Sequence, residues 1–189
     1  MNSLERIDAT LHFRRPDRVP VDLHNFQPAA RATGLPLPEV FRDGALLAEA
    51  MLAAWREFGH DMILLENGTA CNAQACGATV TYMDICGNTL PIVDDFIATG
   101  AQVLEIDHKT DARAIKDKAR GKATLLGNID TGLLYSGTPA EVEAACREAI
   151  EIMAPDYGFI LGPGCALGTD TPANNIHALV ESARKYGRY

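Results

Sequence analysis

The sequence has no apolar run that approaches the length of a membrane span, and its first six residues lack the basic and apolar regions of a signal peptide. Basic residues are in deficit: 17 Lys and Arg stand against 25 Asp and Glu, and the formal net charge of −8 would repel nucleic-acid phosphates. Cysteines number only five, an odd count, so reduced thiols are expected rather than a disulfide framework. These absences predict a soluble cytoplasmic protein without a membrane or nucleic-acid partner.

The chain instead alternates between short apolar runs and segments with helical spacing. Its 189 residues, 47% of them hydrophobic, suffice for a single domain with one core, 1–189. The expected strands are 19–23, 62–66, 78–83, 103–107, 124–130 and 158–162. A short first helix at about 2–11 precedes expected helices at about 43–58, 91–100, 111–120, 138–153 and 171–183. This alternation predicts an α/β fold with a largely parallel sheet.

Two of the expected helices open with the same Thr-Pro-Ala triplet. Thr138 and Glu141 have the spacing of a capping box, with Pro139 at the first helical position. The second triplet begins at Thr171, 33 positions later, which suits one strand and one helix per repeat.

Titratable and metal-binding side chains gather where the expected strands end. In parallel α/β folds, ligands bind at the carboxyl ends of the strands. A doubly wound sheet usually carries a glycine-rich phosphate loop after its first strand, and the lack of one here favours a barrel. The strand ends carry Asp22 and His24, Glu66, Cys86, Asp107 and His108, Asn128 and Asp130, and Cys165.

Cys86 has the sequence context of a reactive thiol. It lies just before an expected helix whose first turn contains Pro91, and unpaired amides at a helix N-terminus stabilise a thiolate. A thiolate binds zinc or attacks an electrophile. Cys146, on an apolar helix face, is expected in the core instead, and Cys71 and Cys76 are expected to be structural or incidental.

Several segments, in order along nearly the whole chain, resemble the uroporphyrinogen decarboxylase family. Within it they are most similar to the corrinoid-dependent branch, which moves a methyl group from a methylcobamide to a thiol such as coenzyme M. The resemblance implies an eight-unit βα barrel. The segments that carry it are 16–21, 65–70, 86–92, 103–107, 126–130 and 159–165.

The resemblance implies a zinc site and a corrinoid protein as partner. The methyltransferase branch binds zinc through a His-x-Cys pair and a later Cys; Cys86 and Cys165 match the two thiolates, and Asp84 stands in place of the histidine. A carboxylate can also ligate zinc. Asp107 is expected as a further ligand displaced by substrate, or as a residue that orients the ligands.

The decarboxylase branch offers an alternative, a lyase of porphyrin biosynthesis acting on a tetrapyrrole. There a carboxylate faces the pyrrole rings, and Glu66 lies near that position, whereas the arginine-rich loop that holds the acid side chains is not visible at 24–31. For either reaction, Glu66 and Asp107 are the expected catalytic residues. His24, Asn128 and Asp130 are the expected substrate-binding residues.

The chain is shorter than a complete barrel, which takes about 250 residues. Near 82–85 the resemblance jumps from the second barrel strand of the family to the end of its fifth strand. We therefore expect an internal deletion at 82–85, which leaves about five of the eight βα units. An incomplete barrel exposes sheet edges, which favours a homodimer. A shortened remnant without catalytic activity is therefore a third reading.

Overall fold

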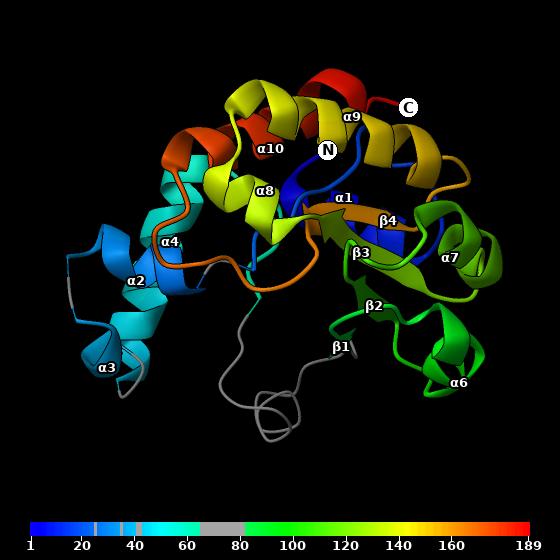
Figure 1. Ribbon diagram of the computed structural model, residues 1–189, viewed down its shortest axis with the longest axis horizontal. Helices are drawn as coiled ribbons and strands as arrows, with labels where there is room; N and C mark the ends of the chain where they lie inside the picture. Colours follow the sequence, from blue (N-terminus) through cyan, green and yellow to red (C-terminus); the bar gives the residue numbers. More distant parts are fainter. Residues whose placement is uncertain (25, 35, 41–42, 65–81) are drawn as a thin grey trace.

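The computed structural model describes residues 1–24, 26–34, 36–40, 43–64 and 82–189. Its centre is a parallel four-stranded sheet in the order β1-β2-β3-β4 (Figure 1). The strands are β1 Tyr82–Ile85, β2 Val103–Ile106, β3 Thr124–Ile129 and β4 Phe159–Pro163. The sheet confirms the predicted parallel α/β architecture, although β1 extends to Ile85 and therefore includes Asp84.

Two segments from the first third of the chain continue this sheet beyond β4. Val21 bridges Leu161 in parallel, and the N–H of Asp22 donates to the Leu161 carbonyl at 3.0 Å. Asp22 in turn bridges Met62 in parallel. The first segment of the chain thus lies beside the last strand, as in a barrel. The strands expected at 19–23 and 62–66 are reduced to these isolated bridges in the described residues.

Helices α6, α7 and α9 lie along the outer face of the sheet, and α2, α3 and α4 lie on the opposite side of the molecule from α6 and α7 (Figure 1). α9 packs on α7 and α10, whereas α2 and α3 pack on α4 at one side of the molecule. No helix in the described part of the chain is both long and apolar enough to cross a membrane. The helices are α1 Ser3–Leu11, α2 Phe26–Ala32, α3 Leu37–Val40, α4 Gly44–Phe58, η1 Leu90–Ile92, α6 Val93–Ala98, α7 Ala112–Ala119, α8 Thr131–Ser136, α9 Pro139–Met153 and α10 Ala173–Tyr186.

The predicted helix starts are partly confirmed. Thr138 and Glu141 form the capping box of α9, and the Asp111 carboxylate accepts from the Ala114 N–H at the start of α7. The second Thr-Pro-Ala triplet differs, because the Thr171 hydroxyl donates to the Gly168 carbonyl and does not cap α10. The same triplet therefore opens both helices but caps only one of them.

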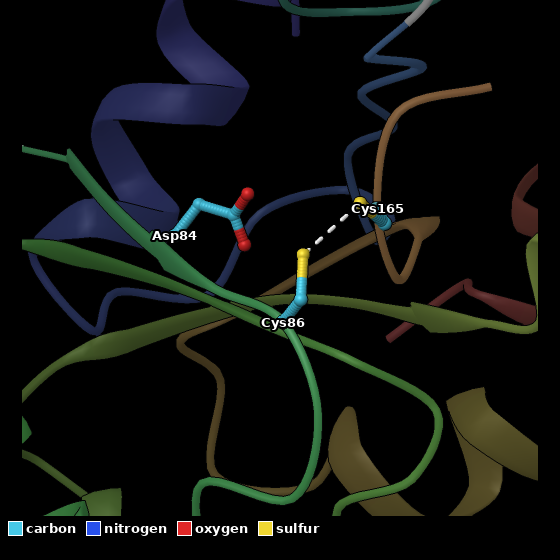
Figure 2. Close-up of side chains that lie close together, drawn as sticks. All are labelled: Asp84, Cys86 and Cys165. Atoms are coloured by element: carbon cyan, nitrogen blue, oxygen red, sulfur yellow. Dashed lines mark hydrogen bonds between the residues drawn. The ribbon is translucent and has the colours of Figure 1, made fainter. Parts of the chain in front are cut away.

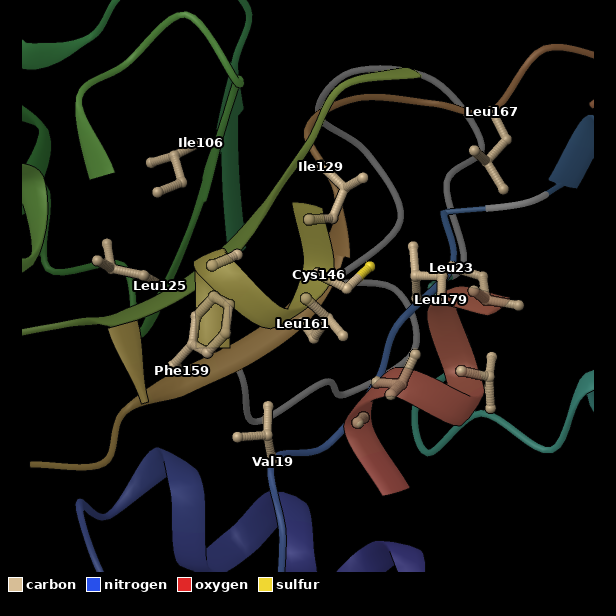
Figure 3. Close-up of a cluster of buried hydrophobic side chains, with 14 of the residues drawn as sticks. Val19, Leu23, Ile106, Leu125, Ile129, Cys146, Phe159, Leu161, Leu167 and Leu179 are labelled. Carbon is tan, nitrogen blue, oxygen red and sulfur yellow. The ribbon is translucent and has the colours of Figure 1, made fainter. Parts of the chain in front are cut away.

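Successive side chains along each strand point to opposite faces of the sheet, so the core consists of one apolar cluster on each face. Ile106, Leu125 and Phe159 belong to a large cluster between the sheet and its helices (Figure 3). Val103, Leu126 and Ile160 face the other way, where Ile7 and Leu11 of α1, with Met62 and Tyr82, pack against them. We call this second side the inner face of the sheet. Apolar side chains thus fill much of this face, and Leu126 lies beside Glu105 in the strand register.

A buried ion network joins the N-terminal segments to the sheet. The Asp61 carboxylate, 1% exposed, accepts from the guanidinium groups of Arg6 and Arg18, each at 2.6 Å. It also accepts from the Ser3 hydroxyl and the Val21 N–H, both at 3.0 Å. This one carboxylate therefore ties α1 to the segment that pairs with β4.

Candidate metal centre

Two cysteine thiols meet above the carboxyl ends of the strands. Cys86 follows β1 directly, Cys165 lies two residues beyond β4, and their sulfur atoms are 3.3 Å apart (Figure 2). Because β2 and β3 separate β1 from β4, this contact is made across the mouth of the curved sheet. The structure thus brings together the two cysteines expected to be metal ligands.

Asp84 completes a group of three ligating side chains. Its neighbours Met83 and Ile85 pack on the helix side of the sheet, so by alternation Asp84 faces inward, toward the thiols. One carboxylate oxygen and the two sulfur atoms all lie within 4.8 Å of one another. Ligand atoms around a tetrahedral zinc ion lie roughly 3–4 Å apart. The two thiols and the carboxylate are ligand types that zinc accepts, and they lie close enough together to be a candidate site for it.

Partial burial makes the Cys165 thiol resistant to ionisation. Burial, together with the adjacent Cys86 thiol, raises the pKa of Cys165 to about 12. A bound cation would reverse this effect, because a coordinating thiol is deprotonated by the charge of the metal. The Cys165 thiol is therefore a poor nucleophile by itself, and a metal ion would convert it to a thiolate ligand.

Asp107 supports the loop that carries Cys86. Its carboxylate accepts from the backbone N–H of Gly87 at 2.8 Å and of Lys109 at 3.0 Å. Although burial opposes it, these bonds lower the pKa of Asp107. Thr110 adds a second tie, since its hydroxyl accepts from the Thr89 N–H at 3.0 Å. Asp107 lies outside the three-residue ligand group, and its contacts are those of a positioning residue.

A buried polar cluster lies on the inner face. Glu105 projects inward because its neighbours Leu104 and Ile106 face the helices, and its carboxylate lies 2.9 Å from His24 Nδ1. The N–H of His24 donates to Asp22 at 3.2 Å. Both carboxylates are at most 1% exposed. Sequence reasoning did not single out Glu105. A lone acid inside the apolar run of β2 was the available signal.

The three expected substrate-binding residues do not form one site. His24 lies in the buried cluster, whereas Asn128 and Asp130 line an outer groove of about 560 Å³ with residues of α7 and α9. Asp130 caps α8 by accepting from the Gly132 N–H, and His108 lies 2.9 Å from Asp107. Glu66, Cys71 and Cys76 lie outside the described residues.

The buried Asp22 predicts an unusual pH dependence of stability. Burial and the nearby Glu105 raise the pKa of Asp22 to about 7, so the folded chain holds this proton while the unfolded chain releases it near pH 4. Stability should therefore fall as the pH rises from about 4 to 7 through this group. We expect Asp22→Asn to be more stable than the wild type by about 2–4 kcal/mol at pH 8 and nearly equal to it at pH 4.

Urea unfolding of both proteins at the two pH values checks this prediction. His60 acts in the opposite direction, because burial lowers its pKa to about 4, so stability gained through His60 rises with pH between about 4 and 6.5. Both proteins carry His60, so its contribution cancels in their difference. If the free energies of unfolding of the two proteins differed by the same amount at pH 4 and at pH 8, Asp22 would not hold its proton in the folded chain.

Comparison with known proteins agrees with this architecture. The family model described as Uroporphyrinogen decarboxylase (URO-D) matches residues 2–85 and 82–186. The methylcobamide:CoM methyltransferase MtbA of Methanosarcina mazei is 34% identical to this chain over 111 residues. MtbA of Methanosarcina acetivorans is 30% identical over 107 residues, and each match covers 56% of this chain. A uroporphyrinogen decarboxylase of Magnetococcus marinus is 26% identical over 96 residues, 51% of this chain.

These matches span only part of each relative. They cover 30% of the length of each MtbA and 27% of the decarboxylase. Among solved structures, a methyltransferase from Methanosarcina mazei superposes with a TM-score of 0.83 at 17% identity, covering 98% of this chain and 99% of that one. The superposition supports the fold, and the family match extends over both halves of the sequence. The chain belongs to the uroporphyrinogen decarboxylase family.

Proposed function

We propose that this chain transfers a methyl group from a methylcorrinoid to a thiol, with a zinc ion held by Asp84, Cys86 and Cys165. The observation that carries the proposal is the convergence of these three side chains at the mouth of the barrel. It is supported by relatives that are methylcobamide:CoM methyltransferases. The donor would be a methylcobamide on a partner corrinoid protein, as the sequence resemblance implies.

Zinc, when bound, would lower the pKa of a substrate thiol so that the thiolate forms at neutral pH. The chain's own residues supply the rest. Cys86 is exposed at the mouth, so a substrate can approach the centre from solvent. Asp107 and Thr110 accept from the backbone N–H groups of Gly87 and Thr89, which holds in place the loop that follows Cys86. A rigid support of this kind is what keeps metal ligands in place during turnover.

The decarboxylase reaction has weaker support. A tetrapyrrole substrate carries several carboxylates and needs basic partners, whereas the described inner face carries the acids Asp22, Asp84 and Glu105 beside His24. The sequence between 65 and 81, which leads into β1, also contains no Lys, Arg or His. The charge of the site therefore favours a thiol acceptor over a polyacid.

The proposed function also implies a location and an assembly for the chain. The odd number of cysteines favours reduced thiols over a disulfide framework, so we propose a cytoplasmic location for the chain. The two matches of the family model meet at 82–85, and there we place the missing βα units. Among the described strands, β1 pairs on one side only. We propose that a second copy of the chain covers that open side.

The proposal is tested by incubating the zinc-loaded chain with methylcobalamin and a small thiol. We expect loss of the methylcobalamin absorbance together with formation of the methyl thioether, at a rate well above that without protein. Cys146→Ala, which removes a buried thiol in the core cluster on the helix side of the sheet, should keep this activity, and the Cys86→Ser, Cys165→Ser double variant should lose it. A folded chain that binds zinc but methylates no thiol would contradict the proposed function and favour a remnant.

A further inference from the structure

We propose that Cys86 and Cys165 are also a redox-modification site: a small disulfide, the oxidised form of the acceptor thiol, converts the pair to an intramolecular disulfide. The inference rests on the proposed function and adds the regulation of the same site. The centre then holds its metal only while the acceptor is in its thiol form.

The separation of the two sulfur atoms suits both states of the pair. They lie 3.3 Å apart (Figure 2). Two sulfur atoms bound to one tetrahedral zinc ion lie roughly 3.8 Å apart, since each Zn–S bond is about 2.3 Å long. In a disulfide the separation is about 2.05 Å. The observed distance lies between these values, so a movement of about 1 Å or less brings the pair to either state.

The fold keeps the two cysteines in contact although 79 positions separate them in sequence. On one side, the N–H of Gly87 donates to Asp107 at 2.8 Å. On the other, the N–H of Gly164 donates to the Ile129 carbonyl at 2.8 Å. A Cβ at Gly164 would lie only 2.8 Å from the backbone nitrogen of His108, so the glycine lets this loop approach the end of β2. Groups held in contact react as if at very high concentration, so the folded chain favours this one disulfide.

Exposure assigns a different role to each thiol. Cys86 is exposed, Cys165 is partly buried, and Cys146 is buried in the cluster on the helix side of the sheet. A small disulfide that arrives from solvent therefore meets Cys86 first, with Cys165 beside it to complete the reaction. Among the cysteines of the described residues, only Cys146 is out of reach.

The reaction is a thiol–disulfide exchange in two steps. The sulfur of Cys86 bonds to one sulfur of the small disulfide, whose S–S bond breaks and releases one thiol. The sulfur of Cys165 then bonds to that of Cys86 and displaces the second thiol. The cysteine pair loses two electrons, the small disulfide gains them, and the two cysteine protons leave with the two released thiols.

The disulfide and the metal exclude each other. A disulfide offers no thiolate, so only the Asp84 carboxylate of the three ligands would remain. Conversely, a metal ion that binds the reduced pair stabilises it against oxidation. The proposed acceptor thus controls the centre through its own redox state, because the thiol is the substrate and its disulfide is the inactivator.

Peptide mapping tests the predicted disulfide. In the Cys71→Ser, Cys76→Ser variant, trypsin places the three remaining cysteines on separate peptides, 57–109, 123–147 and 148–184. The metal-free variant is treated with 2-hydroxyethyl disulfide, and its peptides are mapped by mass spectrometry without reduction. We expect 57–109 joined to 148–184 in most molecules, at least about 10-fold more often than any pair with 123–147. In urea this preference should be lost, because Cys146 is nearer than Cys86 to Cys165 in sequence and loop closure then favours it.

Cobalt in place of zinc reports the state of the centre through the sulfur-to-cobalt charge-transfer absorbance. We expect the oxidised wild-type chain to lack this absorbance and to regain it after reduction with dithiothreitol. Cys146→Ala, the matched control, should behave identically. A reduced chain that binds cobalt but yields only mixed disulfides, or all three crosslinks equally, overturns this inference alone. A reduced chain that binds no cobalt overturns the proposed function, whether or not the disulfide forms.

Discussion

The Cys86→Ser, Cys165→Ser double variant is expected to bind cobalt at least about 100-fold more weakly than the wild-type chain, because it retains only the Asp84 carboxylate of the three ligands. Serine hydroxyls keep the shape of the side chains but are poor ligands at neutral pH. A titration followed by the charge-transfer absorbance measures the affinity directly, since that band requires a thiolate on the metal.

The Cys146→Ala variant controls for the loss of a thiol as such. Cys146 is fully buried on α9, and burial raises its pKa to about 12, which suits a packing residue. This variant should bind cobalt like the wild type. If the double variant also did so, the metal would be bound elsewhere and the site at the mouth of the barrel would be wrong.

Asp61→Ala is expected to destabilise the chain by about 3–5 kcal/mol, because it leaves the Arg6 and Arg18 guanidinium groups without their shared carboxylate. Arg6 is itself buried, with a side chain 7% exposed, so water cannot take the place of the lost partner. The Ser3 and Val21 donors lose their acceptor in the same change. Urea unfolding of the variant and the wild type measures this difference.

Asp17→Ala is the matched comparison. Asp17 also pairs with Arg6, at 2.6 Å, but its side chain is 42% exposed, so solvent replaces most of the lost interaction. We expect a loss well below that of Asp61→Ala. Similar losses in both variants would show that Asp61 does not hold the N-terminal segments to the sheet.

The site could be predicted from the sequence wherever a local rule fixes the geometry. Parallel strands end at the same edge of a sheet, so the positions of Cys86 and Cys165 after two strands were enough to expect them near each other. The Thr138 capping box and the Asp111 cap follow from residue type and spacing alone. In each case the determining interactions lie within a few residues or follow from the topology.

The remaining features depend on contacts distant in sequence. Glu105 faces His24 across 81 positions, and no local pattern reveals that partner. Asp107 is expected from the sequence to act in catalysis or to orient the ligands, and only the structure reveals that its oxygens accept from the backbone N–H groups of Gly87 and Lys109. A position at the end of a strand also does not indicate whether a side chain faces the inner face or the outer groove. The sequence therefore predicts one site for His24, Asn128 and Asp130, whereas His24 is buried and only the other two line the groove.

Burial of Asp22 near Glu105 lowers the stability of the fold at neutral pH, because the ionised carboxylate loses its solvation and is repelled by a second acid.

The zinc content of the purified chain, determined after dialysis against metal-free buffer, is the most direct measurement. The three ligands at the mouth of the barrel predict about one zinc ion per chain in the wild type and none in the Cys86→Ser, Cys165→Ser variant. A folded wild-type chain that retains no zinc, even after incubation with excess zinc, would contradict the proposed metal centre and the methyl transfer that depends on it.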